Sequence, residues 1–238
     1  MAYSYASNAE VKEMKSFCTD VFLDVQKEVQ EFFKFDFKLI GSGGKQVVTH
    51  NDNQPFDLDY NIIIQKDKQD LISNPRQIKS IFYDAFKKVF SEHIKGFDKN
   101  GYAKLNNSTS VITLKHISKG EIEFSFDVAI MHKNKDNYLE RIIFDKNTGN
   151  YIWNIVKQSG DIYKKANIVK KQCDWNEVRD RYLELKNYYL STDQDMKSFA
   201  IYTMVINEFY QTLWTNHYDW KITARVSRDF LSICQTNC

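Results

Sequence analysis

The chain has 238 residues, of which 42% are hydrophobic and 27% are charged. These proportions are typical of a soluble globular protein, and the length suffices for one large domain or two small ones. The formal net charge of +2 excludes a protein whose overall basic charge drives tight binding to a nucleic-acid polymer, so small nucleotides or a local contact are favoured.

The cysteines and the apolar runs indicate the compartment. Cys18, Cys173, Cys234 and Cys238 form no C-x-x-C pair, which favours free thiols in a reducing compartment. No apolar run approaches the length of a transmembrane helix. The first residues also lack the basic and apolar regions of a signal peptide. We therefore expect a cytoplasmic protein with no membrane partner.

The first half of the chain carries the pattern of a mixed sheet preceded by a helix. Apolar residues recur at steps of three and four through 8–35, which predicts a long amphipathic helix that covers one face of a sheet. Asn74-Pro75 marks the start of a second helix. Short apolar or alternating runs bounded by turn residues predict strands. The predicted strands are 37–40, 56–65, 102–105, 111–117 and 121–131.

The composition changes after about residue 135, where no further strand is convincing. Asp174 and Glu177 have the spacing of a capping box that opens a helix, and Thr192 with Asp195 is a candidate cap for the next one. The predicted helices are 153–157, 162–172, one from 174, one running to about Trp214, and 222–233. We therefore predict a mixed α/β domain at 1–135 and a helical domain at 136–238 that packs against it to form a cleft.

Three aspartates stand out from the predicted strands. Asp57 and Asp59 are two residues apart, so on a strand they share one face while Leu58 and Tyr60 take the other. Asp127 interrupts the alternating apolar residues of 122–130, and a carboxylate in such a strand needs a partner or a function. Like charges this close repel one another, and a divalent cation with a preference for hard oxygen ligands, such as Mg²⁺, removes the repulsion.

A glycine-rich segment, Gly41-Ser42-Gly43-Gly44, ends the first predicted strand. It predicts a tight turn, because glycine allows backbone conformations that other residues avoid. Closely spaced backbone N–H groups in such a turn form a nest that suits phosphate. Gly41 and Ser42 are therefore candidate nucleotide-binding residues.

In this order, the Gly-Ser turn, the Asp57-Leu-Asp59 strand and the lone Asp127 resemble the nucleotidyltransferase superfamily of DNA polymerase beta. The stretches Ser110-Val-Ile-Thr-Leu and Ile122-Glu-Phe-Ser-Phe-Asp-Val-Ala-Ile are similar to the hairpin that carries the third aspartate in cyclic GMP-AMP synthase and its bacterial relatives. The resemblance covers roughly 37–131.

The resemblance implies roles for named residues. Asp57 and Asp59 would hold two Mg²⁺ ions, or Mn²⁺ in their place. Asp127 would hold the acceptor-side ion and help to deprotonate the acceptor. Ser42 and nearby amides would bind the triphosphate, although Gly43, Gly44 and Lys45 depart from the bulkier residues that often follow the Gly-Ser pair. Relatives also place a cation on the donor phosphates in the helical half, where this chain has Lys164 and Lys165.

The expected activity is metal-dependent transfer of a nucleoside monophosphate from an NTP to an acceptor, with release of pyrophosphate. The acceptor is left open among a nucleotide, RNA, a protein side chain and a small molecule. The base preference and the oligomeric state are also open. The alternative hypothesis is a non-catalytic nucleotide-binding partner, such as a toxin–antitoxin component, although such a partner has no need to keep three carboxylates.

Overall fold

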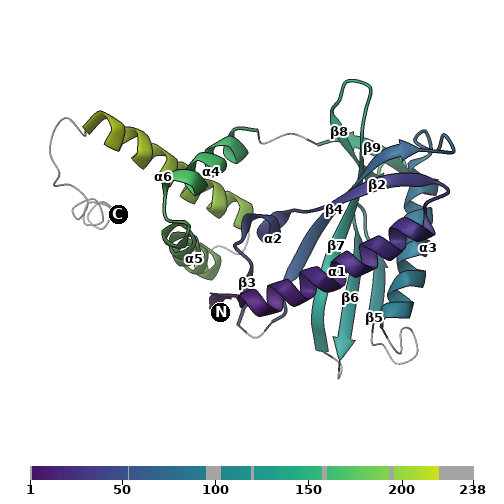
Figure 1. Cartoon of the computed structure of the whole chain (residues 1–238), viewed down its shortest axis with the longest axis horizontal. Helices are drawn as coiled ribbons and strands as arrows, with labels where there is room; N and C mark the ends of the chain where they lie inside the picture. Colours follow the sequence, from purple (N-terminus) through teal and green to yellow (C-terminus); the bar gives the residue numbers. More distant parts are fainter. Residues whose placement is uncertain are drawn as a thin grey trace. The chain divides into compact units, whose positions relative to one another are not determined.

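The computed structural model describes residues 2–52, 54–94, 103–118, 121–156, 160–192 and 196–219 (Figure 1). The chain divides into two compact units, Met1–Gln158 and Ser159–Cys238. This boundary lies later than the predicted boundary at residue 135, because two strands beyond that point extend the sheet. The predicted packing of the helical part against the sheet stays a prediction. No helix in the described ranges is long and apolar enough to cross a membrane.

The first unit contains a mixed seven-stranded sheet and a small two-stranded sheet within its described residues. The large sheet has the order β2-β4-β7-β6-β5, and β8 pairs with β7 and with β9. The pairing of β4 with β7 is parallel, and the other pairs are antiparallel. The elements are β1 Tyr3–Tyr5, α1 Asn8–Glu28, β2 Phe33–Leu39, α2 Gly41–Lys45, β3 Thr49–Asn51, β4 Asp57–Asp67, α3 Pro75–His93, β5 Ala103–Asn107, β6 Ile112–Ser118, β7 Glu121–Lys133, β8 Leu139–Asp145 and β9 Asn150–Ile155.

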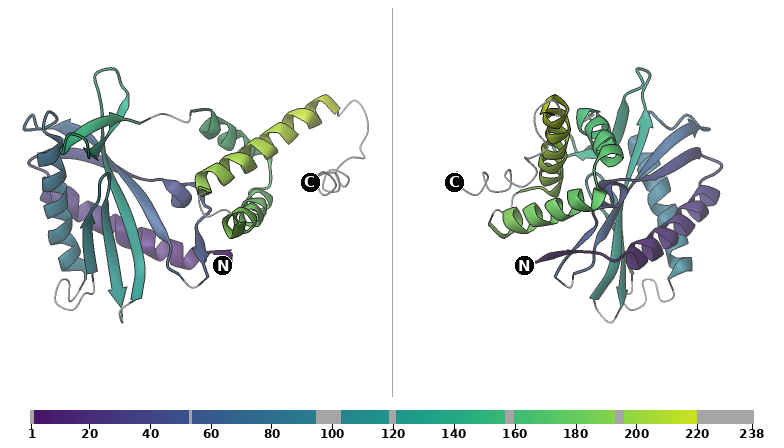
Figure 2. Two further views of the ribbon diagram at one scale, coloured as in Figure 1. Left: turned by 180° about the vertical axis from the view of Figure 1, so that it is seen from behind. Right: turned by 60° about the vertical axis from the view of Figure 1, so that its left-hand side comes forward.

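Helices α1 and α3 lie on the same face of the large sheet and enclose the core (Figures 1 and 2). Helix α1 begins at a capping box, in which Ser7 and Glu10 satisfy each other's backbone N–H groups. Phe22 of α1 is fully buried, and its ring lies 4.9 Å from Tyr60 of β4 and 5.6 Å from Phe86 of α3. This aromatic contact joins both helices to one face and leaves the other face of the strands for the site.

Two local predictions near the first strand are wrong. The predicted helix over 8–35 ends at Glu28, and Phe33 and Phe35 belong to β2 instead. Apolar residues alternate with charged ones from Phe33 to Lys38, and pairing with β4 favours this period of two over the helical period. The glycine-rich segment forms the short helix α2 rather than a tight turn.

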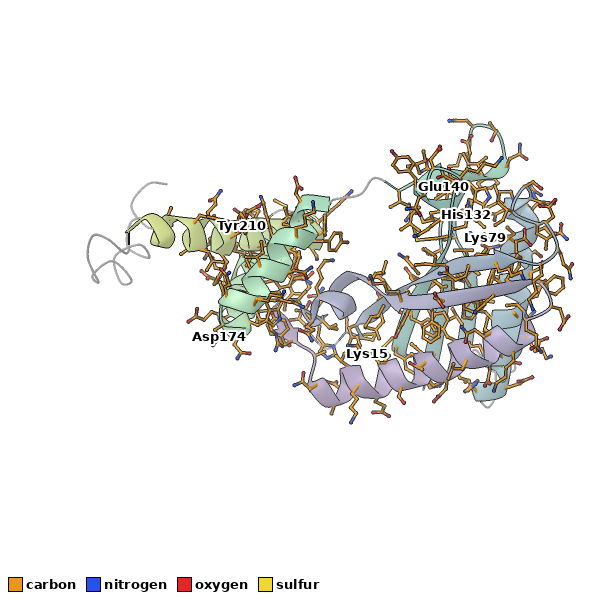
Figure 3. The ribbon with its side chains drawn as sticks, turned by 45° about the horizontal axis from the view of Figure 1, so that its top comes forward. Lys15, Lys79, His132, Glu140, Asp174 and Tyr210 are labelled. Atoms are coloured by element: carbon orange, nitrogen blue, oxygen red, sulfur yellow. The ribbon has the colours of Figure 1, made fainter. Side chains whose placement is uncertain are left out.

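The region after residue 135 is also different from the prediction. Trp153 lies in β9, which pairs with β8, so the predicted helix over 153–157 is wrong. The indole Nε1 of Trp153 donates to the carbonyl of Ile72 at 2.7 Å, and its ring lies 4.1 Å from the ring of His132. His132 on β7 in turn faces Glu140 on β8, with Nε2 3.0 Å from Oε2 (Figure 3). These long-range contacts stabilise strands that the local sequence does not indicate.

The second unit consists of helices in its described residues: α4 Gly160–Gln172, α5 Trp175–Thr192 and α6 Ser198–Asp219. Helix α6 contacts both others, since Lys165 of α4 donates to Asn207 at 2.7 Å and Arg181 of α5 contacts Glu208 at 3.2 Å. Asp174 accepts from the N–H of Asn176 at 2.8 Å and so caps α5 (Figure 3). The predicted reciprocal bond of the capping box, from Glu177, stays a prediction.

The predicted fold class is confirmed: a long N-terminal helix, a mixed sheet and a helical C-terminal region. Cys18 and Cys173 are free thiols, as expected. The predicted helix at 222–233, the cap at Asp195, and Cys234 and Cys238 lie outside the described residues.

Candidate active site

The pairing of three strands builds the candidate site. The parallel register of β4 and β7 sets Asp57 opposite Ser125 and Asp59 opposite Asp127. The antiparallel register of β6 and β7 sets Thr113 opposite Asp127. Residues that are directly opposite across paired strands share one face of the sheet. The three predicted aspartates therefore lie together on one face, which we call the carboxylate face.

The opposite face of the same strands is apolar, and this explains the orientation of the aspartates. Leu58, Phe126 and Val128 are fully buried, and Tyr60 is 4% exposed. They belong to the core that α1 and α3 cover. Because successive residues of a strand alternate between faces, burial of these side chains directs the aspartates to the other side, as the sequence predicts.

Hydroxyl groups hold two of the three carboxylates. Thr113 Oγ1 donates to Oδ1 of Asp127 at 2.5 Å, and Ser125 Oγ donates to Oδ1 of Asp57. The sequence indicates that Ser125 shares the face of Asp127, but it does not indicate Thr113. A register shift between His116 and Ile117 moves β6 by one residue along β7. If strand pairing is counted back from the hairpin turn without this shift, Thr113 is therefore placed opposite the wrong residue of β7.

Partial desolvation and neighbouring charges change the acidity of Asp57 and Asp59. Asp57 keeps an exposed surface, but partial removal of its carboxyl group from water raises its pKa to about 6. The charges of Asp127 and Asp59 add to this rise, and Lys115 opposes it. Removal from water and the charge of Asp127 also raise the pKa of Asp59, and Lys45 opposes that rise. The three acids therefore interact electrostatically, and two lysines of the same unit are close enough to affect them.

Helix α2 brings the Gly-Ser pair directly against the second aspartate. The N–H of Ile40 donates to the carbonyl of Asp59 at 2.8 Å, which continues the pairing of β2 with β4 up to the start of the helix. Gly41 has a φ of +59°, and a Cβ there would overlap Oδ2 of Asp59 and lie 3.0 Å from its Cγ. Glycine is therefore required at this position for both reasons. Ser42 follows it and is half-buried.

The residues after the Gly-Ser pair also have a structural explanation. A Cβ at Gly43 would lie 2.9 Å from Leu39 and 3.0 Å from Leu58, so glycine lets the short helix pack against the strands. Lys45 ends the helix, and its Nζ donates to the carbonyl of Gly41 at 3.3 Å. Burial lowers the pKa of Lys45, and the charge of Asp59 opposes that change. The small residue at position 43 therefore allows the packing of α2 on the strands, and the charge of Lys45 acts on Asp59.

The carboxylate face has the donor chemistry of a divalent-cation site. Three carboxylates share it. Desolvation, followed by repulsion between the carboxylates, raises the pKa of Asp57 and Asp59, and a bound divalent cation relieves the repulsion. Across the described part of the chain, however, no three His, Cys, Asp or Glu side chains form a ready-made site for one ion. Oδ1 of Asp57 and Oδ1 of Asp127 accept hydrogen bonds from Ser125 and Thr113. The residue types and their shared face fit a divalent cation, and Asp57, Asp59 and Asp127 are the residues that would hold it.

The remaining predicted site residues lie in the second unit. Lys164 is exposed on α4. Lys165 donates to Asn207, and its Nζ lies 5.4 Å from the centre of the Tyr210 ring (Figure 3). The contacts of Lys165 therefore join α4 to α6, and its predicted role at the donor phosphates stays a prediction.

Comparisons with known proteins connect this arrangement to a fold. No family model matches the chain, and no curated protein matches its sequence. Solved structures do match. DncV cyclic AMP-GMP synthase of Vibrio cholerae, in complex with nonhydrolyzable GTP, is 11% identical with a TM-score of 0.60 over 86% of this chain. E. coli MS115-1 CdnC with ATP is 12% identical with a TM-score of 0.55 over 86% of this chain.

The match covers only part of these proteins. The chain spans 68% of the length of DncV, 63% of CdnC and 42% of the CD-NTase CdnG of Bradyrhizobium diazoefficiens. DncV is itself described as a prokaryotic homologue of cyclic GMP-AMP synthase. At these identities the likeness concerns the fold, and it agrees with the resemblance in the motifs. The chain therefore shares the fold of DncV and CdnC.

Proposed function

We propose that this chain is a metal-dependent nucleotidyltransferase, which transfers a nucleoside monophosphate from an NTP to an acceptor and releases pyrophosphate. The observation that carries the proposal is the shared face of Asp57, Asp59 and Asp127, which the parallel pair β4 and β7 assembles from distant parts of the chain. A protein that only binds nucleotides has no need for three repelling carboxylates on one face, since each costs free energy there.

Each site residue has a role in the proposal. Asp57 and Asp59 would hold two divalent cations, and Asp127 would hold the acceptor-side ion and help to deprotonate the acceptor. The chemistry that these cations would supply is stabilisation of the entering and the leaving oxygen of an in-line displacement. Gly41 lets Ser42 and the amides of α2 lie beside Asp59, where they bind the triphosphate. Lys164 and Lys165 remain predicted ligands of the donor phosphates.

The proposed acceptor is a second nucleotide. Solved structures of the same fold include the cyclic AMP-GMP synthase DncV of Vibrio cholerae in complex with a linear intermediate, 5′ pppA(3′,5′)pG. Near-neutral charge, +2 overall, counts against an RNA acceptor, because such binding depends on many phosphate contacts. A nucleotide acceptor needs no further macromolecular surface.

Incubation of the purified chain with all four α-labelled NTPs and Mg²⁺ or Mn²⁺ tests the proposal. We expect labelled oligonucleotide and pyrophosphate without any added acceptor, and loss of both in Asp57→Asn, Asp59→Asn and Asp127→Asn. Asp36→Asn is the matched control, because Asp36 is an exposed carboxylate on β2 of the same sheet. Label that appears only in added RNA or protein would contradict the nucleotide acceptor. NTP binding with no labelled product would support the non-catalytic partner.

A further inference from the structure

Two hydroxyl side chains contact the carboxylates from neighbouring strands. Ser125 lies directly opposite Asp57 in the parallel pair, and Thr113 lies directly opposite Asp127 in the antiparallel pair. Each hydroxyl donates to Oδ1 of the carboxylate that faces it. In both pairs the hydrogen bond engages one carboxylate oxygen, so Oδ2 is available to another ligand.

We infer that Thr113 and Ser125 are positioning residues, which orient Asp127 and Asp57 for binding divalent cations. The inference rests on the proposed function and deepens it. A hydroxyl that donates to one carboxylate oxygen restricts rotation of the carboxylate, and the other oxygen can then ligate a cation. Hydrogen bonds of this kind to metal-ligating groups contribute about 10–100-fold to metal affinity.

The surroundings of the two hydroxyls support an orienting role. Ser125 is 5% exposed, and a buried hydroxyl donor is costly unless it is hydrogen-bonded. Thr113 is half-buried on β6, and its χ1 angle is restricted because threonine is branched at Cβ. Both residues lie within the sheet, and the paired backbone around them limits their movement. The two donors are therefore held in place beside the carboxylates that they orient.

The two residues act on different carboxylates, so they have different effects. Asp57 is proposed to ligate both cations and Asp127 only the acceptor-side cation. Loss of the Thr113 hydroxyl therefore weakens the binding of one of the two cations, whereas loss of the Ser125 hydroxyl weakens the binding of both. A general loss of sheet stability would not separate the two cations in this way.

The test measures Mn²⁺ binding by electron paramagnetic resonance in the presence of a nonhydrolyzable NTP, so that no turnover is needed. We expect two Mn²⁺ per chain in the wild type. In Thr113→Val we expect one unchanged Mn²⁺ and one whose dissociation constant rises about 10–100-fold. In Ser125→Ala both dissociation constants rise. Thr113→Ser restores the hydroxyl and returns the second Mn²⁺ to wild-type affinity.

Two controls separate orientation from folding. Thr19→Val removes a hydroxyl that donates to the carbonyl of Lys15 at 2.8 Å on α1, and it leaves both Mn²⁺ affinities unchanged. Thr113→Val in an Asp127→Asn background causes no further loss, because Thr113 acts through Asp127. Thermal melts of all variants confirm that they are folded under the conditions of the binding measurement.

The outcomes distinguish the inference from the function on which it rests. If the wild type binds Mn²⁺ with the nucleotide but Thr113→Val and Ser125→Ala bind it equally well, the inference is overturned and the proposed function stands. Tighter binding by the variants also overturns it, because the hydroxyls would then compete with the cation. If the wild type binds no Mn²⁺ with any NTP, the proposed function itself fails.

Discussion

Replacement of Gly41 by alanine tests how closely α2 and the second aspartate depend on each other. Gly41 has a φ of +59°, and a Cβ at this position would overlap Oδ2 of Asp59 and lie 3.2 Å from its Cβ. The new methyl group therefore meets two obstacles, a backbone conformation that disfavours side chains and a carboxylate that must move. Gly149 provides a matched control, because its φ is +68° and a Cβ there would meet nothing within 4 Å.

Gly41→Ala and Gly149→Ala both place a Cβ on a left-handed backbone, and only Gly41→Ala also brings that Cβ against Asp59. A left-handed backbone costs a residue with a Cβ about 1–2 kcal/mol, and the lower entropy of the unfolded chain returns about 0.4–1 kcal/mol. We therefore expect Gly149→Ala to lower the free energy of unfolding by about 1 kcal/mol. Crowding of Asp59 adds about 1–3 kcal/mol for Gly41→Ala, so its loss is about 2–4 kcal/mol.

Urea denaturation without divalent cations gives the stabilities, and Mn²⁺ titration with a nonhydrolyzable NTP gives the affinities. Gly41→Ala should lose cation affinity because Asp59 is displaced, and Gly149→Ala should bind Mn²⁺ as the wild type does. Wild-type affinity in Gly41→Ala would refute the proposed contact between Gly41 and a metal-ligating Asp59. Equal losses of stability in the two variants would refute the calculated cost of the contact.

Further predictions concern pH, the sheet and the second unit. The pKa of Asp57 rises from 3.8 to about 6 on folding. Without divalent cations, its contribution therefore makes the free energy of unfolding fall as pH rises between these values. Asp57→Asn should remove this contribution in denaturant melts at several pH values, and an unchanged dependence of stability on pH would contradict the prediction. Trp153→Phe loses the hydrogen bond to Ile72 and should destabilise the first unit by about 1–3 kcal/mol without changing Mn²⁺ affinity. Lys165→Met loses the hydrogen bond to Asn207 and should lower the melting temperature. An unchanged melting temperature with a raised KM for NTP would instead indicate that Lys165 contacts the donor phosphates.

The local sequence determined the features that depend on periodicity. Alternation between apolar residues and Asp57, Asp59 and Asp127 placed the aspartates on the polar sides of their strands, because a strand alternates faces whatever it pairs with. The cap at Asn74 and Pro75 located the start of α3 for a similar reason, since the signal lies within one turn of the helix.

Some elements were misassigned because two periods fitted the same residues. Phe32 and Phe33 continue the apolar stripe of α1, while Phe33 and Phe35 also alternate as a strand. Only pairing with β4 selects the strand from Phe33 onward. Trp153 in β9 carries no strong local strand pattern. Its assignment depends on β8 and on the carbonyl of Ile72, which are far from it in the chain.

The site itself was decided by tertiary structure. Sequence alone determined that this protein has three aspartates suited to one face, and it indicated their chemistry through the resemblance. The parallel register of β4 with β7 brings Asp59 beside Asp127, and the bulge at His116 brings Thr113 onto Asp127. Register depends on how distant strands pack, and a shift of one residue changes every partner across the sheet. For this reason the aspartates could be named from the sequence and Ser125 placed on their face, but the partnership of Thr113 with Asp127 and the contact of Gly41 with Asp59 could be assigned only from the fold.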